Sequence, residues 1–365
     1  MGHVELDAQH PLTSGLTSGS RLVRAYRGDR PPVTPVWFMR QAGRSLPEYR
    51  DLRVGTRMLD ACLDPALASE ITLQPIRRHG VDAGIFFSDI VVPLRLVGVA
   101  VDIVAGRGPV FDKALRTGAD VAELTSIDLD RLDEGIAPIS EAVGLTVAEL
   151  NERPNGDSPA TPLIGFAGAP FTLAAYLTEG GPSKDHLAAR TLMHADPGAW
   201  AALMEWCADL SGRFLRAQVL AGASAAQLFD SWAGALSLAD YERHVAPASQ
   251  RALSWVTGLV PTVHFGVGTG ELLGAMHAIG VNAVGVDYRI PLDEAARRIG
   301  AAVPLQGNLD PALLGAPWEV LEAAVRRIVD EGRAAPAHVF NLGHGVPPET
   351  DPAVLTRIVE LVHSL

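Results

Sequence analysis

Two arginines, Arg40 and Arg44, flank the tripeptide Gln-Ala-Gly directly after the apolar segment Pro-Val-Trp-Phe-Met. Their spacing of four residues places both side chains on one face of a turn. A planar guanidinium group binds a carboxylate through two parallel hydrogen bonds, which an ammonium group cannot do. A single arginine here could equally form a structural ion pair. The pair favours a site that binds carboxylates.

Asp89 is the most informative acidic residue, because it lies between the apolar segments Ile-Phe-Phe-Ser and Ile-Val-Val-Pro. A carboxylate in apolar surroundings requires hydrogen-bond donors or positive charge for compensation. The alternative is that Asp89 caps the N-terminus of a helix, a position that aspartate suits. Pro93 follows closely and disfavours a helix that begins at Asp89. The pattern therefore predicts a functional carboxylate.

Four further side chains could complete a site for a flat, anionic ligand. His344 lies between two glycines, where the backbone can approach a ligand closely. Tyr176 and Ser231 could donate hydrogen bonds, and Phe229 could line the ligand. The chain contains no Gly-x-Ser-x-Gly nucleophile motif, no His-Glu-x-x-His zinc motif and no phosphate-binding loop.

The elements that must position these residues alternate between apolar strands and amphipathic helices. Helical patterns cover 64–80, 196–222, 270–280, 291–300 and 317–332. Eight strands count out a closed (β/α)8 TIM barrel, whose active site lies at the carboxyl ends of the strands. The alternative is an open doubly wound sheet, but only the weak glycine-rich match 266–270 favours it. The expected strands are 35–38, 82–88, 162–167, 225–230, 262–267, 283–287, 304–308 and 338–343.

The remaining segments divide the chain into a leader and one catalytic domain. Residues 1–20 are polar and are expected to form a mobile leader, and residues 21–365 a single barrel domain. The long connection 98–160 is expected to contain a hairpin and a helix near 136–152. Its last part, 151–161, is rich in turn-forming residues and predicts an exposed loop.

Composition excludes several classes of protein. A net charge of −12 argues against nucleic acid as a partner, although residues 21–57 hold nine arginines and three acidic residues. No apolar run is long enough to cross a membrane, and the N-terminus does not resemble a secretory signal, so we expect a cytoplasmic protein. Two cysteines, Cys62 and Cys207, exclude a disulfide framework and predict buried residues away from the strand ends.

Several segments together resemble the uroporphyrinogen decarboxylase family: PVWFMRQAGRSLPEYR, FSDI, GFAGAPFTLAAYLTEGG, LFDSWAG, LQGNLDP and NLGHGVPPETDP. They occur in the family's order from about residue 20 to the C-terminus. The resemblance implies a (β/α)8 barrel, a homodimer, no cofactor and no metal. It implies decarboxylation of the four acetate arms of uroporphyrinogen. The residues to which it assigns substrate contacts are Arg40, Arg44, Asp89, Tyr176, Ser231 and His344.

The implied chemistry fits these residues. Arginines would hold the substrate carboxylates, and Asp89 would accept the pyrrole N–H groups and stabilise a cationic ring. We therefore place Asp89, Arg40, Tyr176 and His344 in catalysis. The proton donor stays open between Arg40 and a water molecule that it holds, since arginine is a reluctant acid.

Two other functions compete with this reading. A zinc-dependent cobalamin methyltransferase would need a thiolate near His264, which Phe265 and Gly266 follow instead. A non-catalytic tetrapyrrole carrier would need the binding groups alone.

Overall fold

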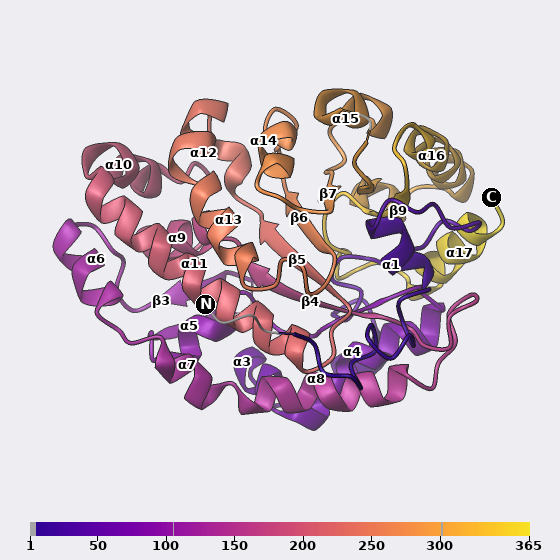
Figure 1. Cartoon of the computed structure of the whole chain (residues 1–365), viewed down its shortest axis with the longest axis horizontal. Helices are drawn as coiled ribbons and strands as arrows, with labels where there is room; N and C mark the ends of the chain where they lie inside the picture. The colour runs from indigo at the N-terminus through magenta and orange to yellow at the C-terminus, as the bar shows by residue number, and fades with distance from the viewer. Residues whose placement is uncertain (1–4, 105, 301) are drawn as a thin grey trace.

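A parallel sheet curls around an apolar interior, and helices pack around its outside (Figure 1). The computed structural model describes residues 5–104, 106–300 and 302–365. Seven strands pair in parallel in the order β1-β4-β5-β6-β7-β8-β9. They are β1 (Gly84–Ile85), β4 (Leu163–Gly168), β5 (Ala225–Asp230), β6 (Thr262–Gly266), β7 (Ala283–Gly285), β8 (Leu305–Leu309) and β9 (His338–Leu342).

The segment 35–38 joins the two edges of this sheet and closes the barrel. Val36 forms a parallel bridge with Phe340 of β9, whose N–H donates to the carbonyl of Pro35 at 2.8 Å. On the other side, the N–H of Asp82, just before β1, donates to the carbonyl of Val36 at 2.8 Å. Seven of the expected strands are therefore present, the segment 35–38 pairs through one bridge at the eighth position, and the predicted (β/α)8 barrel is confirmed.

Strand residues alternate between the barrel interior and the helix layer, because successive side chains of a strand point to opposite faces. Phe166, Phe229 and Phe265 pack in the interior cluster, whereas Leu228 packs in the outer one. Tyr26 of the short helix α1 (Arg21–Tyr26) joins the interior cluster.

The outer helices begin and end close to the capping residues that the sequence indicates. Asp64 and Asp196 accept hydrogen bonds from backbone N–H groups of the first turns of α4 and α11, and Gly80 ends α4 in the left-handed conformation. The main outer helices are α4 (Pro65–His79), α8 (Ala137–Leu150), α9 (Pro170–Glu179), α11 (Pro197–Leu220), α13 (Ala246–Ser254), α14 (Leu273–Ala278), α15 (Leu292–Ile299), α16 (Trp318–Glu331) and α17 (Pro352–His363).

Smaller elements lie in the loops. The predicted hairpin in the long connection is confirmed as β2 (Val101–Val104) paired with β3 (Gly108–Phe111), and the predicted helix as α8. The other short helices are α2 (Pro47–Leu52), α3 (Met58–Cys62), α5 (Val92–Leu96), α6 (Gly118–Thr125), α7 (Asp130–Gly135), α10 (Leu187–Ala195) and α12 (Leu238–His244). No helix in residues 5–104, 106–300 or 302–365 is both long and apolar enough to cross a membrane.

The N-terminal segment packs on the barrel, in contrast to the mobile leader that its composition predicted. A ring nitrogen of His10 lies 3.0 Å from the carbonyl oxygen of Val219, and the Thr17 hydroxyl lies 2.8 Å from that of Ser224. Both His10 and Thr17 are buried. Residues 1–4 lie outside the described part of the chain.

The predicted exposed loop 151–161 is found in part: Glu152, Pro154, Gly156, Asp157 and Pro159 are exposed, whereas other residues of the segment pack inward. Asn155, Ser158 and Thr161 are buried. The Ser158 hydroxyl donates to the carbonyl of Leu16 at 2.6 Å, which ties the loop to the leader. The buried polar residues of this loop therefore bind other segments, while the rest of the loop faces water.

Asp82 connects the segments that meet where the barrel closes. Its carboxylate is fully buried and accepts hydrogen bonds from the N–H of Val36 at 2.7 Å, Asn155 at 3.0 Å and Arg21 at 3.2 Å. A ring nitrogen of His363, in α17, lies 2.7 Å from the same carboxylate. This cluster, which we call the closing cluster, joins α1, the segment 35–38, the 151–161 segment and α17.

Candidate active site

The predicted site residues lie at one end of the barrel, because each follows the carboxyl end of a parallel strand. Arg40 follows the segment 35–38, and Asp89 follows β1. Tyr176 belongs to α9, directly after β4. Ser231 follows β5, and His344 follows β9.

Arg40 has a backbone conformation that its neighbours hold in place. Its φ of 61° lies in the left-handed region, which costs a non-glycine residue about 1–2 kcal/mol. The buried amide of Gln41 accepts from the N–H of Phe38 at 2.9 Å and donates to the carbonyl of Ala83 at 3.0 Å. The Arg40 loop is therefore fixed to the start of β1. Strain of this kind is retained where surrounding structure enforces it, often at functional sites.

The loop after β9 fixes the other side of Arg40. The Asn341 amide accepts from the N–H of Met39 at 2.9 Å, and the N–H of Val346 donates to the carbonyl of Met39 at 2.9 Å. A Cβ on Gly345 would lie 2.5 Å from Cδ of Arg40. A larger residue at 345 would thus force the Arg40 side chain to move.

The charge of Arg40 reaches three of the other predicted residues. It opposes the rise in the pKa values of Asp89 and Tyr176, and it helps to lower the pKa of His344. Effects of the Arg40 charge on all three groups require short separations. Arg40, Asp89, Tyr176 and His344 therefore form one electrostatically coupled group.

Asp89 is only weakly compensated within the protein. Its carboxylate accepts a hydrogen bond from the N–H of Val91 at 3.0 Å, while α5 begins later, at Val92. Burial raises its pKa, and the Val91 bond and the Arg40 charge offset this only in part. The helix-cap alternative does not hold, because Val91 occupies the N-cap position of α5. Asp89 thus has capacity to accept donors from a ligand.

Tyr176 lies in an aromatic group at the edge of the site. Its ring packs edge-on against Trp232 with centroids 5.7 Å apart, and the ring of His186 lies 4.8 Å from that of Trp232. Burial, followed by the nearby Asp89 charge, raises the pKa of Tyr176 to about 12. The phenol therefore stays protonated at neutral pH and can donate a hydrogen bond.

His344 is held between close backbone contacts. A Cβ on Gly343 would lie 2.2 Å from the backbone nitrogen of Tyr288, so both flanking glycines make room for other parts of the protein. Burial lowers the pKa of His344, and Arg40 and Arg289 lower it further. The ring is thus neutral at neutral pH before a ligand binds. Among the described residues it makes no hydrogen bond, so both ring nitrogens are free.

The apolar base of the site belongs to the barrel interior. Phe229 packs edge-on against Phe166 and Phe265, with centroids 5.5 and 6.0 Å apart. Met39 lies in the same cluster, and Ile90 packs against it. Met39 precedes Arg40 and Ile90 follows Asp89 in the sequence, so each charged residue is directly adjacent to an apolar residue of this cluster.

Arg44 and Ser231 are less closely joined to this group. Arg44 is exposed, and its charge acts on Tyr49. Ser231 is partly buried, and its hydroxyl forms no hydrogen bond with any described residue. Neither Arg40 nor Arg44 forms an ion pair within the described ranges, whereas Arg21, Arg24 and Arg57 of the same basic run do.

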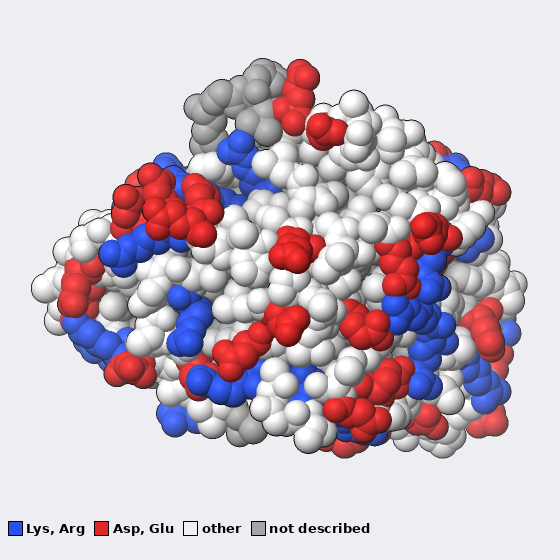
Figure 2. Space-filling model, turned by 90° about the horizontal axis from the view of Figure 1, so that it is seen from below, with Lys and Arg blue, Asp and Glu red and all other residues white. Residues whose placement is uncertain are grey.

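Many surface charges form ion pairs. On the face in Figure 2, acidic and basic side chains lie close together, without a broad region of one sign. The pairs include Arg77 with Glu70 and Glu149, and Arg251 with Asp209. Arg40 and Arg44 are among the arginines that form no ion pair within the described residues, so their guanidinium groups are available to a ligand.

The expectations for His264 and Cys62 have different outcomes. His264 is fully buried in β6 with a ring nitrogen 3.6 Å from the carboxylate of Asp230, which suits its interpretation as structural. Cys62 is buried as expected, but it lies close enough to Asp89 for that carboxylate to add to its raised pKa. The expectation that Cys62 lies away from the strand ends is therefore wrong.

Sequence reasoning missed several positioning residues. Gln41 holds the Arg40 loop, and its only signal was its place between the two arginines. Trp232 and His186 pack beside Tyr176, and His186 comes from a loop without any recognisable pattern.

The first expected result concerns Arg40. Arg40→Gly should abolish most activity while melting at the native temperature or above, because glycine relieves the left-handed strain. Arg40→Lys keeps the charge but loses the planar fork, so it should restore activity only in part. The measurements are kcat/KM and melting temperature, with Arg27→Lys as an exposed control. Native kinetics for Arg40→Lys together with a lowered melting temperature for Arg40→Gly would show that Arg40 is structural.

A second expected result concerns His344. His344→Asn should fold normally and turn over about tenfold or more slowly, or release partly decarboxylated products, because a hydrogen-bonding and proton-handling group is lost. Chromatography of the products by carboxylate number measures this. His277→Ala, a partly buried helical residue in α14, serves as the control. A native rate and product pattern would remove His344 from the site.

Comparison with known proteins identifies relatives along almost the whole chain. The family described as Uroporphyrinogen decarboxylase (URO-D) matches residues 17–365. Uroporphyrinogen decarboxylase of Leifsonia xyli subsp. xyli is 70% identical over 98% of each chain. That of an Arthrobacter species is 66% identical over 96% of this chain and 99% of the relative. A solved methyltransferase from Methanosarcina mazei shares the fold, with a TM-score of 0.77, 19% identity and coverage of 94% and 97%.

Proposed function

The chain belongs to the uroporphyrinogen decarboxylase family, and we propose that it converts uroporphyrinogen III to coproporphyrinogen III by removing the four acetate carboxylates. It is thus a carbon–carbon lyase of heme biosynthesis. The observation that supports this most strongly is the coupled group of Arg40, Asp89, Tyr176 and His344 at the carboxyl end of the barrel.

Each member of the group has a role that its environment suits. Asp89 accepts the pyrrole N–H groups, because its carboxylate has one donor from the protein and little competing charge. Arg40 and Arg44 bind substrate carboxylates, since neither is paired within the described residues. Tyr176 donates a hydrogen bond, and Phe229 supports the flat macrocycle.

The reaction requires an electron sink next to the departing carboxylate. A proton adds to the pyrrole carbon beside the acetate arm and makes the ring cationic. The bond to the carboxylate then breaks, carbon dioxide leaves, and the bonding electrons neutralise the ring as an exocyclic methylene. A proton on the methylene and loss of the ring proton give the methyl product. Asp89 stabilises both cationic species electrostatically.

The reaction as proposed uses no metal and no organic cofactor. We further propose that residues 21–365 act as one catalytic domain, that two copies form a homodimer, and that the enzyme works in the cytoplasm. A methyltransferase activity has less support, because His264 is followed by Phe265 and Gly266 and no thiolate ligand is adjacent in sequence.

The decisive experiment is incubation of the pure protein with uroporphyrinogen III under anaerobic, reducing conditions. We expect products with seven, six, five and finally four carboxylates, and the same rate after exhaustive chelation. Recovery of the unchanged octacarboxylate would contradict the proposal, and so would activity that returns only on addition of a metal. The Asp89→Asn protein is the control for non-enzymatic loss of carbon dioxide.

A further inference from the structure

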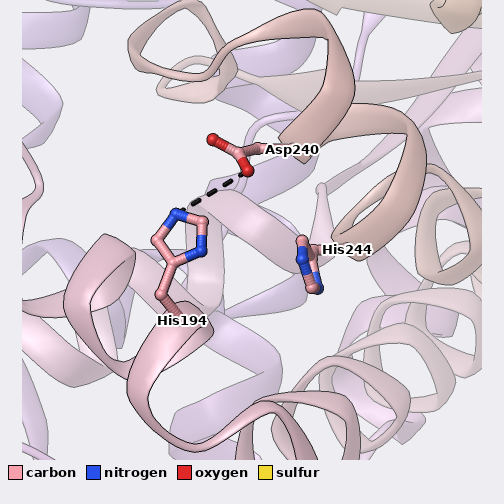
Figure 3. A group of neighbouring side chains, drawn as sticks. All are labelled: His194, Asp240 and His244. Carbon is pink, nitrogen blue, oxygen red and sulfur yellow. Dashed lines mark ion pairs between the residues drawn. The ribbon is translucent and has the colours of Figure 1, made fainter.

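Two helices outside the candidate active site bring two imidazoles and a carboxylate together. Asp240 and His244 belong to α12, four residues apart and so on the same face of the helix. His194 lies in the last turn of α10. Ligand atoms of the three side chains all lie within 4.8 Å of one another. Figure 3 shows the ring of His194 directed toward the carboxylate of Asp240.

The distances suit coordination better than direct bonding. His194 Nε2 lies 3.6 Å from Asp240 Oδ1, which is too long for a hydrogen bond. Two ligands on a tetrahedral zinc ion, with bonds of about 2.0–2.1 Å, are about 3.3 Å apart. All three ligand atoms lie within 4.8 Å of one another, so side-chain rotations could bring them to bonding distance around one ion. The rings of His194 and His244 make no hydrogen bond in the described ranges, and the ion-pair partner of His194 is Asp240, which is itself a proposed ligand.

The surroundings can supply the remaining coordination positions. The His194 side chain is 56% exposed and that of Asp240 is 23% exposed, so water can reach the cluster. A surface hollow lined by Leu187, Arg190, Thr191, His194 and Ala195 adjoins the cluster. The indole N–H of Trp200 in α11 donates to the carbonyl of His244 at 3.1 Å and fixes the end of α12. One of the three ligands thus stands on an anchored helix end.

We propose that His194, Asp240 and His244 form a binding site for one divalent transition-metal ion of the zinc type. Two imidazoles and one carboxylate select such ions over Mg²⁺ and Ca²⁺, which prefer oxygen ligands. The ion links α10 to α12 and so braces the segment that carries His186, which packs on Trp232 beside Tyr176. The site is separate from the decarboxylation residues, and its role is to stabilise this part of the barrel.

The test is a titration of the metal-free protein with Zn²⁺, followed by calorimetry and thermal unfolding. We expect one ion per chain, a rise in melting temperature and no comparable effect of Mg²⁺. His194→Ala, Asp240→Asn and His244→Ala should each raise the dissociation constant for zinc by about tenfold or more. Even the loss of a residue that only hydrogen-bonds to a ligand costs this much affinity. His277→Ala should bind as the native protein does.

X-ray absorption at the zinc edge of the loaded protein should show two imidazole nitrogens and additional oxygen ligands. Absence of zinc binding to the native chain, or equal binding by the three ligand variants, would overturn the proposal. The three variants lie on two helices, so any one that fails to fold is replaced by the others.

Discussion

Asp89→Asn is expected to lower kcat/KM by about two to three orders of magnitude, while the variant melts at the native temperature or above. The amide keeps the volume of the carboxylate, removes its charge and presents a donor toward the pyrrole N–H groups. Removal of one preorganised electrostatic group from a transition state costs about 3 kcal/mol. The measurements are kcat/KM with uroporphyrinogen III and the melting temperature.

The expected stability follows from the raised pKa of Asp89. Between the unfolded value of 3.8 and the higher folded value, the folded protein binds more protons than the unfolded one. Stability therefore falls as the pH rises through this interval, and the ionised carboxylate costs stability at neutral pH. Asn cannot ionise, so that cost disappears in the variant and the pH dependence flattens.

Two further variants separate charge from shape. Asp89→Glu should retain part of the activity, because the charge survives at a shifted position, whereas Asp89→Ala should be as slow as Asp89→Asn. Glu141→Gln, an exposed carboxylate on α8, is the control for loss of one negative charge. An Asn variant that melts well below the native protein and decarboxylates at the native rate would assign Asp89 a structural role.

Asp82→Ala is expected to have the largest effect on stability. It removes the fully buried carboxylate that binds Val36, Asn155, Arg21 and His363. Removing one member of a buried charged pair costs about 3–5 kcal/mol, because its partners lose their compensation. We expect the melting temperature to fall by roughly 5 to 15 °C, as measured by scanning calorimetry.

Asp51→Asn, an exposed carboxylate on α2, is the matched control and should melt as the native protein does. Asp82→Asn keeps an acceptor for the Val36 N–H and should lie between the Ala variant and the native protein. Because Asp82 lies outside the coupled group at the site, the folded Ala variant should keep its KM. Native stability of the Ala variant would mean that the closing cluster contributes little.

The strands, and the positions of Arg40 and Asp89 at the strand ends, were predictable, because local pattern determines both. Apolar segments bounded by turns set the eight strands, and the carboxyl ends of the strands placed Arg40 and Asp89 at the same end of the barrel. The contacts of the leader and of the 151–161 segment could not be predicted, since some of their polar residues hydrogen-bond to segments far away in sequence. The composition of a short segment does not indicate such distant partners.

The contributions of Gln41 and His186 could not be derived for the same reason. Gln41 acts through the Ala83 carbonyl of another element, and His186 through the ring of Trp232, in a different βα unit. The left-handed conformation of Arg40 also depends on contacts from β9, about 300 residues away in the chain.

The closing cluster has a consequence for how the chain folds during synthesis. His363 is 281 residues from Asp82 in the sequence. Strand β9, which pairs with the segment 35–38, is among the last strands to leave the ribosome. Until then the nascent sheet has open edges, and the segment 35–38 lacks its β9 neighbour. Unpaired strand edges are prone to association with other chains. Closure of the barrel thus follows the synthesis of β9 and requires it to meet the segment 35–38 from much earlier in the chain.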